Sequence, residues 1–356
     1  MSKPPVNLSN LRRLAILMPN WLGDAVMAEP SIRAINLAAP SLELSLFGKP
    51  SAVSMLEGHP AISSIVGIND KGIFGPVKSG RALQADDADA VLLLRNSFRS
   101  GLGAAVSRIR PRIGFARDAR QALLTHPTTP PAGDRPFPTV DFYATLVESA
   151  FGISVDDRLP RLVTTPSEQA AATQLLADIT GPIVAFVPGG SKLKKRWPLE
   201  RFVDLAHRLG STANAVVLLG GPDERGLLSE LEAKARRDEG PRVIDLASRG
   251  LGLHSLRGVI ERCAAVITND TGPRHLAVAL GIPTVALFGP TDHRWTTLRG
   301  ARERILLGEP FLPEEQIADR HPKMCRVDRI PVGDVLRAVN ATLLKPDGSK
   351  SVSSTT

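Results

Sequence analysis

Two loops in the second half of the chain carry residue types that bind phosphate groups. The first, at 188–198, reads PGGSKLKKRWP, and the second, at 268–275, reads TNDTGPRH. Glycines and helix N-termini expose backbone N–H groups to anions, and basic side chains add charge. We therefore predict phosphate binding by Gly190, Ser191, Lys195, Thr271 and Gly272. Ordinary strand-to-helix turns with a capping side chain are the structural alternative.

Two further loops carry a carboxylate after an apolar run. Residues 220–225 read GGPDER, and a carboxylate after a strand can hold the hydroxyl groups of a ribose, as in dinucleotide-binding folds. Residues 18–24 read MPNWLGD, which puts Asp24 beyond the carboxyl end of the first strand. From there Asp24 could act as a general base on a hydroxyl group. An acid that only complements the dipole of the following helix is the alternative in both loops.

A basic stretch lies between Arg95 and Arg120. It holds seven arginines against one acid, Asp118, and so carries most of the chain's net charge of +8. The planar arginine fork fits phosphate and carboxylate groups. Nucleic-acid surfaces add aromatic side chains for base stacking, but aromatic residues are only 4% of this chain. The stretch therefore favours an anionic small target or a membrane surface, with a solvated basic face as the alternative.

No metal site and no disulfide are expected. Asp87 and Asp89 have the Asp-x-Asp spacing of some metal-dependent glycosyltransferases, but they precede an expected strand and so lie away from its carboxyl end. The seven histidines show no ligand spacing. Two cysteines, Cys263 and Cys325, do not make a disulfide framework.

Short apolar runs alternate with amphipathic stretches, which predicts an α/β fold with mainly parallel sheets. We expect strands at 14–18, 42–47, 90–94, 183–187, 215–219, 242–245, 265–268 and 284–288. We expect helices at 24–37, 141–151, 167–178, 199–209, 223–237, 253–262, 272–280 and 332–344. The Pro-rich residues 125–139 are expected to form an irregular loop. Ligands of such folds bind beyond the carboxyl ends of the strands, where the four loops fall.

The pattern divides into two Rossmann-like halves. With 356 residues the chain has room for two domains, which we predict at 1–165 and 166–345, followed by a disordered tail at 346–356. A hydrophobic share of 43% excludes a disordered chain. No apolar run approaches the ~20 residues that span a bilayer. Residues 1–10 lack the apolar core of a secretory signal, so we predict a cytoplasmic protein.

Together these motifs resemble glycosyltransferase family 9, the heptosyltransferases of lipopolysaccharide core synthesis, and most of all its heptosyltransferase II branch. The matching stretches keep the family's order: MPNWLGDAV at 18–26, VLLLRNS at 91–97, RIGF at 112–115, VPGGSKLKKRWP at 187–198 and NDTGPRHLAVALGIPTVALFGP at 269–290. The resemblance implies a GT-B fold, in which two Rossmann-like domains face each other across a cleft.

The resemblance also implies a reaction. Heptose would move, with inversion, from ADP-L-glycero-D-manno-heptose on the second domain to heptosyl-Kdo-lipid A on the first, without a metal or other cofactor. By the matching motifs, Asp24 is the general base and Lys195 lies near the donor phosphates. Donor binding would involve Gly190, Ser191, Lys195, Glu224, Asp270, Thr271, Gly272 and His275. Acceptor binding would involve Asn20, Trp21, Arg95, Arg99, Arg117 and Arg120.

Such an enzyme would work peripherally at the cytoplasmic face of the inner membrane and would not bind nucleic acid. Residues 291–295, TDHRW, and the pair Pro273-Arg274 depart from the family's pattern on the donor side. Another nucleotide sugar is therefore an alternative donor. A sugar-nucleotide epimerase or hydrolase, or a binding module without catalysis, would keep the same architecture.

Overall fold

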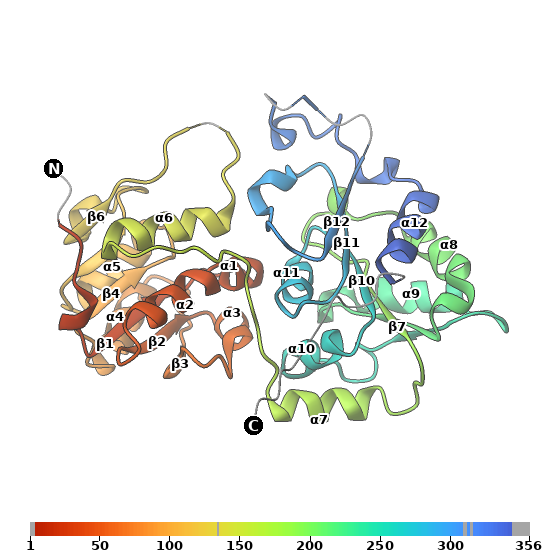
Figure 1. Ribbon diagram of the computed structural model, residues 1–356, viewed down its shortest axis with the longest axis horizontal. Coiled ribbons are helices and arrows are strands. Elements are labelled where there is room, and N and C mark those ends of the chain that lie inside the picture. The colour runs from red at the N-terminus through yellow and green to blue at the C-terminus, as the bar shows by residue number, and fades with distance from the viewer. Residues whose placement is uncertain (1–3, 134, 309–311, 314–315, 344–356) are drawn as a thin grey trace, which may run out of the picture.

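The computed structural model describes residues 4–133, 135–308, 312–313 and 316–343, so the tail expected at 346–356 lies outside the described residues. Two α/β halves lie side by side (Figure 1). Each half is built on a six-stranded sheet, and the strand pairings within both sheets are parallel. The expected fold class is confirmed.

The N-terminal sheet has the strand order β3-β2-β1-β4-β5-β6. Its strands are β1 (Arg13–Leu17), β2 (Glu43–Gly48), β3 (Ser64–Gly67), β4 (Ala90–Leu93), β5 (Arg112–Phe115) and β6 (His126–Thr128). One face packs against α1 (Leu22–Met27), α2 (Glu29–Ala38), α3 (Pro50–Val53) and α6 (Thr139–Phe151). The other face is covered by α4 (Gly75–Ala85) and α5 (Phe98–Val106).

The C-terminal sheet repeats this topology, with the order β12-β11-β10-β7-β8-β9. Its strands are β7 (Ile183–Val187), β8 (Ala215–Leu218), β9 (Arg242–Asp245), β10 (Ala265–Asn269), β11 (Thr284–Phe288) and β12 (Glu303–Leu307). One face packs against α8 (Leu199–Leu209), α9 (Arg225–Ala235) and α12 (Val332–Leu343). The other carries α7 (Pro166–Leu175), α10 (Leu253–Glu261) and α11 (Gly272–Ala279).

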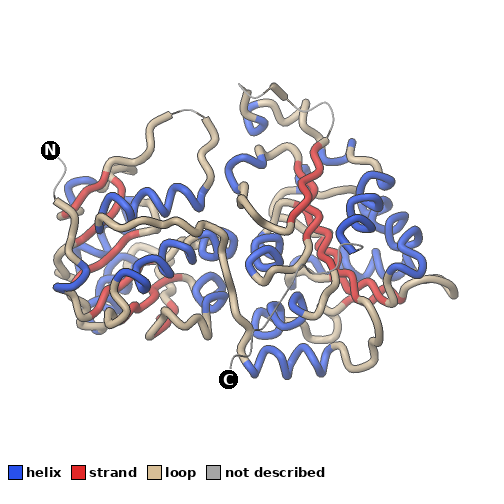
Figure 2. Tube along the Cα trace, in the orientation of Figure 1, coloured by secondary structure: helices blue, strands red, loops and turns tan. Residues whose placement is uncertain are grey.

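The central strands of both sheets are buried on both faces. Figure 2 shows that they lie between helices. β7, β10 and β11 are buried along their whole length, and their sequences are IVAFV, AVITN and TVALF. Near-continuous apolar runs of this kind are what a parallel sheet covered by helices requires. Such runs are also why most strands of the C-terminal sheet were predictable.

Several elements differ from the sequence-based expectation. The helix expected at 24–37 is two helices, α1 and α2, which meet at Ala28 because Pro30, in the first turn of α2, cannot donate a helical hydrogen bond. The loop expected at 125–139 contains the edge strand β6, where Pro127 is tolerated because one side of the strand has no partner. β3, β5, β12, α3, α4 and α5 were not expected.

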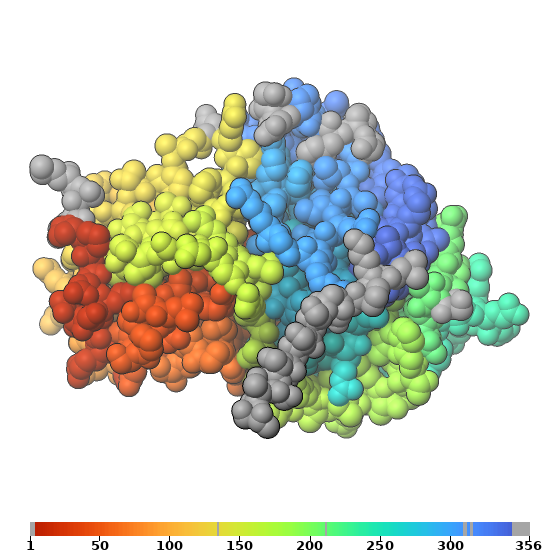
Figure 3. Space-filling view, viewed as in Figure 1, coloured from red at the N-terminus to blue at the C-terminus, as the bar shows by residue number. Residues whose placement is uncertain are grey.

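The two halves are in contact over a broad front, which Figure 3 shows along the middle of the molecule. One continuous cluster of buried apolar residues joins the helices of both halves that face each other. Residues 152–165 connect α6 to α7 along this boundary (Figure 1). Leu162 N–H donates to Ala279 O at 2.9 Å, and Thr139 Oγ1 donates to Trp295 O at 3.0 Å.

Arg257 of α10 ties the halves together from within. The side chain is fully buried, and its Nε and Nη2 atoms donate to Glu168 Oε1 and Oε2 at 2.7 and 2.6 Å. The remaining donors reach the N-terminal half, at Met55 O (2.8 Å) and Glu57 O (3.1 Å). All five N–H groups of the guanidinium are thus satisfied.

Among the described residues, no helix has the length and apolar character needed to cross a bilayer.

The Arg257→Met variant tests this contact. It leaves the carboxylate of Glu168 buried without its partner, so we expect the free energy of unfolding to fall by about 3–5 kcal/mol in urea denaturation. The control is Arg262→Met at the end of the same helix, where the exposed side chain bonds only to Thr173 Oγ1. Its effect should stay within about 0.5 kcal/mol. Equal effects of the two variants would contradict the assigned role of Arg257.

Candidate active site

A cleft of about 970 Å³ lies between the halves, beyond the carboxyl ends of β1, β7, β8, β9, β10 and β11. The N-terminal half contributes the start of α1, and the C-terminal half contributes the loops that follow its strands. Most of the predicted site residues line this cleft, namely Trp21, Asp24, Gly190, Ser191, Lys195, Glu224, Asp270, Thr271, Gly272 and His275.

Asn269 fixes the shape of the loop after β7. Its buried Nδ2 atom donates to Pro188 O at 2.8 Å and to Gly189 O at 2.9 Å. Its Oδ1 atom accepts from Trp197 N at 3.0 Å, so one amide holds both ends of the loop. Sequence reasoning assigned Asn269 no role of its own. An amide at the end of a buried apolar strand was the available signal.

Lys195 and Asp270 form an ion pair in the cleft, with Nζ and Oδ2 2.8 Å apart and both side chains mostly buried. Burial alone would raise the pKa of Asp270, but the charge and hydrogen bond of Lys195, with a further effect of Arg274, hold that pKa below its usual value. Asp270 is therefore a carboxylate. Next to the pair, Thr271 is the N-cap of α11, and its side chain makes no capping hydrogen bond. An ammonium group beside an uncapped helix N-terminus is an arrangement that attracts anions.

Glu224 joins the loops after β7 and β8. Its carboxylate accepts from Gly190 N at 2.7 Å and from Gly221 N at 3.0 Å. Gly189 is required for this approach, because a Cβ there would lie 1.9 Å from Glu224 Oε1. A carboxylate has about four lone-pair sites, so two amide bonds leave capacity for hydroxyl donors.

Asp24 lies in the first turn of α1 and is partly buried in the cleft. Burial raises the pKa of Asp24 to about 6. Burial, together with the charge of Asp24, also raises the pKa of the neighbouring Tyr143. Near neutral pH Asp24 is therefore mostly ionised but more basic than an exposed aspartate, which suits proton removal from a hydroxyl group.

His275 lies against α1 across the domain boundary. A Cβ on Gly23 would be 2.6 Å from His275 Cδ2, so the glycine is what allows α1 and α11 to approach. Burial, with a smaller effect of Arg274, lowers the pKa of His275 to about 3. The imidazole is therefore neutral near pH 7. Its buried Nδ1 atom has no hydrogen-bond partner among the described residues.

The predicted acceptor arginines do not line the cleft, and neither does Asn20. Arg120 is fully buried and donates to Phe115 O, Arg95 O, Ser100 Oγ and Asn96 Oδ1. This corrects the expectation for Arg120, because a guanidinium without exposed surface does not contact an acceptor. Arg95, Arg99 and Arg117 lie nearer the surface of the N-terminal half, so acceptor binding by them stays a prediction.

Two of the residues that depart from the family's pattern, Arg274 and Asp292, have structural roles. Arg274 is fully buried, does not line the cleft and pairs with Glu303 at 2.5 and 2.7 Å. Asp292 is buried and accepts from the side chain of Arg294 and from Ala318 N. Trp295 does line the cleft. So do Leu251, Leu253 and Leu256 at the start of α10, which sequence reasoning missed although they follow β9 at the same edge of the sheet.

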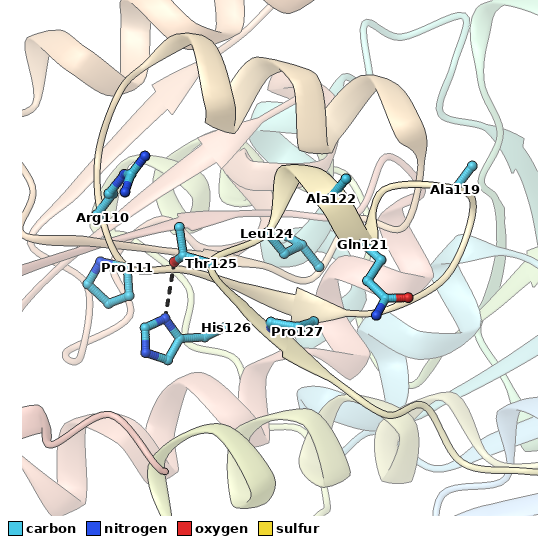
Figure 4. Close-up of a pocket in the computed structure, with 9 residues that line it drawn as sticks. All are labelled: Arg110, Pro111, Ala119, Gln121, Ala122, Leu124, Thr125, His126 and Pro127. Carbon is cyan, nitrogen blue, oxygen red and sulfur yellow. Dashed lines mark hydrogen bonds between the residues drawn. The ribbon is translucent and has the colours of Figure 1, made fainter. Parts of the chain in front are cut away.

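A second hollow, of about 1020 Å³, lies beside β6 (Figure 4). A hydrogen bond of 3.1 Å joins Thr125 Oγ1 and His126 Nδ1 there. The lining residues include no carboxylate and none of the motif residues. We therefore assign the chemistry to the cleft.

Within the described ranges, no group of three or more His, Cys, Asp or Glu side chains is placed to hold a metal ion.

The family model "Glycosyltransferase family 9 (heptosyltransferase)" matches residues 77–324, more than half of the chain. The chain belongs to glycosyltransferase family 9. It is therefore a heptosyltransferase, an enzyme of the glycosyltransferase class. A similar relative is lipooligosaccharide heptosyltransferase 2 of Haemophilus ducreyi, 27% identical over 80% of this chain and 85% of the relative.

Solved structures of family 9 heptosyltransferases share the fold. The Veillonella parvula family 9 structure has a TM-score of 0.80 at 21% identity, covering 94% of this chain and 98% of that one. Escherichia coli ADP-heptose lps heptosyltransferase II has a TM-score of 0.78 at 24% identity, covering 93% and 98%. E. coli heptosyltransferase WaaC with ADP has a TM-score of 0.67 at 18% identity, covering 92% and 97%. Relatives named heptosyltransferase 1 and 3 also match, at 24% and 23% identity.

The Gly23→Ala variant tests the contact between α1 and α11. Because the added Cβ would overlap His275, we expect the free energy of unfolding to fall by about 1–3 kcal/mol. The matched control is Gly226→Ala in α9, where an added Cβ meets no atom within 4 Å. That change should be neutral or stabilise by up to about 1 kcal/mol. If both variants unfold at the wild-type urea concentration, the halves do not approach each other as described.

Proposed function

We propose that this heptosyltransferase transfers heptose from ADP-L-glycero-D-manno-heptose to the inner core of lipopolysaccharide, with heptosyl-Kdo-lipid A as acceptor and with inversion. The observation that carries the proposal is that Asp24 from one half and the Lys195–Asp270 pair from the other line one cleft. The relatives named heptosyltransferase 2 support the second transfer step, and the WaaC structure named with ADP supports the adenine nucleotide.

The C-terminal wall of the cleft would bind the donor. Lys195, Ser191 and the backbone amides of Thr271 and Gly272 would hold the diphosphate. Glu224 would accept hydrogen bonds from the ribose hydroxyls. The apolar side chains of Leu219, Leu251, Leu253 and Leu256 would pack against the base. The amide of Gly190 is bonded to Glu224, so Gly190 would contribute through the close approach of its backbone rather than as a donor.

The reaction would be a single displacement. Asp24 would take the proton of the acceptor hydroxyl as its oxygen bonds to the anomeric carbon. The bond from that carbon to the phosphate oxygen would break, and ADP would leave with the electron pair. Lys195 and the amides of α11 would stabilise the leaving charge, at about 2.7–4 kcal/mol per donor in comparable sites. One displacement inverts the configuration at the anomeric carbon.

The acceptor would enter from the N-terminal side of the cleft. Trp21 is largely exposed at its rim, and Asn20 precedes it. Arg95 and Arg117 lie in the loops that follow β4 and β5, and Arg99 lies in the first turn of α5, toward the same edge of the sheet. They would meet the anionic groups of the acceptor from outside the cleft. A glycolipid acceptor would bring the enzyme to the cytoplasmic face of the inner membrane.

Transfer can be tested directly with purified protein, ADP-heptose and heptosyl-Kdo-lipid A in the presence of EDTA. We expect a product heavier by one heptose, detected by mass spectrometry, and no product with Asp24→Ala. Transfer only to Kdo-lipid A, or only from another nucleotide sugar, would overturn the proposed step or donor. Donor breakdown without any transfer would instead favour an epimerase or hydrolase.

The pH dependence of kcat/KM tests Asp24 as the base. An active base must be ionised, and the pKa of Asp24 is raised to about 6, so kcat/KM should rise with pH and reach half of its plateau near that value. His275, with a pKa of about 3, stays neutral in the pH range where Asp24 titrates, so it does not contribute to the rise of kcat/KM with pH. A profile that stays level down to about pH 5 would contradict the assignment.

A further inference from the structure

One corner of the N-terminal half exposes four large apolar side chains. Ile73 is 84% exposed and Phe74 70%, both in the loop between β3 and α4. Val77 in the first turn of α4 and Phe98 at the start of α5 are 36% and 49% exposed. Clustered exposed apolar side chains indicate a surface that binds a partner or a membrane.

The loop that presents Ile73 and Phe74 is held in place. Arg99 Nη2 donates to Asp70 O at 3.0 Å and to Gly72 O at 2.6 Å. Arg95 Nη1 lies 2.6 Å from Asp70 Oδ2. Two arginines therefore brace the loop from the start of α5, and the exposure of its apolar tip is built into the fold.

Basic residues outnumber acidic residues around this corner. Residues 71–85 and 90–117, which include α4, α5 and their flanking loops, contain no aspartate or glutamate. Exposed cations on these segments are Lys71, Lys78, Arg81, Arg99, Arg108, Arg110 and Arg117. Of the acids just outside them, Asp70, Asp86, Asp89 and Asp118 pair with Arg95, Arg13, Arg12 and Arg117, and Asp87 is exposed. The surface thus combines apolar side chains with an excess of positive charge.

We propose that the α4/α5 face, with the tip Ile73-Phe74, is the surface by which the enzyme docks on an anionic lipid bilayer. Apolar side chains that enter the headgroup region and cations that attract anionic lipids add to each other in such binding. The tip and the start of α5 follow β3 and β4, and so lie toward the same edge of the sheet as Asp24, which follows β1. Docking there turns the acceptor side of the cleft toward the lipid. The inference rests on the proposed function only in that a glycolipid acceptor requires such docking.

Vesicle flotation tests the docking without catalysis. Wild-type protein should float with vesicles of phosphatidylethanolamine and phosphatidylglycerol and remain behind with vesicles of phosphatidylcholine alone. The double variant Ile73→Ser, Phe74→Ser should bind the anionic vesicles at least about tenfold more weakly. The matched apolar control is Leu37→Ser in α2, whose side chain is 71% exposed on the opposite face of the sheet, and it should bind as wild type does.

Charge is tested in the same way. Lys71→Glu with Lys78→Glu should abolish flotation with anionic vesicles, whereas Arg237→Glu, an exposed cation after α9, should leave it unchanged. Undiminished flotation of either double variant would overturn the proposal, and so would an equal loss in the controls.

Two acceptors separate this inference from the proposed function. With a water-soluble acceptor that lacks acyl chains, the Ile73→Ser, Phe74→Ser variant should transfer heptose at the wild-type rate. With the acceptor embedded in vesicles its rate should fall with the binding. Equal loss with both acceptors would mean that the corner binds the acceptor sugar and would overturn membrane docking. Wild-type protein that floats but transfers no heptose would leave docking standing and overturn the proposed function.

Discussion

The close approach of α1 and α11 is the contact on which the site depends. Gly23 of the N-terminal half leaves room for His275 of the C-terminal half, and the starts of the two helices then face one cleft. Asp24 is thereby brought to the wall opposite the Lys195–Asp270 pair. Two sheets of the same topology meet at their carboxyl edges, so loops that follow strands in both can act on one pair of substrates.

Buried polar side chains hold this arrangement, and they differ from the side chains to which we assign chemistry. Arg120, Arg257 and Arg274 are fully buried, and their donors are bonded to carbonyls, hydroxyls or carboxylates of the protein. Asn269 shapes the loop after β7 in the same way. Lys195, Asp270, Glu224 and Asp24 keep some exposure to the cleft. The distinction follows from desolvation, because a buried charge must be fully paired within the protein, whereas a site charge needs capacity left for a ligand.

The sequence predicted the fold class and most elements of the C-terminal half, because its strands are continuous apolar runs bounded by glycine. It predicted less of the N-terminal half, where β6 is three residues long with a central proline and α4 begins with Gly-Pro. Four of the loops that line the cleft were predictable, since each follows an expected strand, but the leucines that follow β9 were missed. Which arginines are buried was not predictable, because local sequence does not show whether an arginine such as Arg120 points inward. Nor does it show that Arg95 and Arg99 brace a neighbouring loop, since their partners lie 25–29 residues away in the chain.

The central claim is that the two walls of the cleft have separate tasks, donor binding on one and proton removal on the other. Calorimetric titration of ADP into the wild type, Asp24→Asn and Lys195→Met tests it most directly. Asp24→Asn should bind ADP with wild-type affinity while its transfer rate falls by about 10²–10⁴, and Lys195→Met should bind ADP more weakly. Loss of ADP binding in Asp24→Asn, or unchanged binding in Lys195→Met, would contradict this division of the cleft.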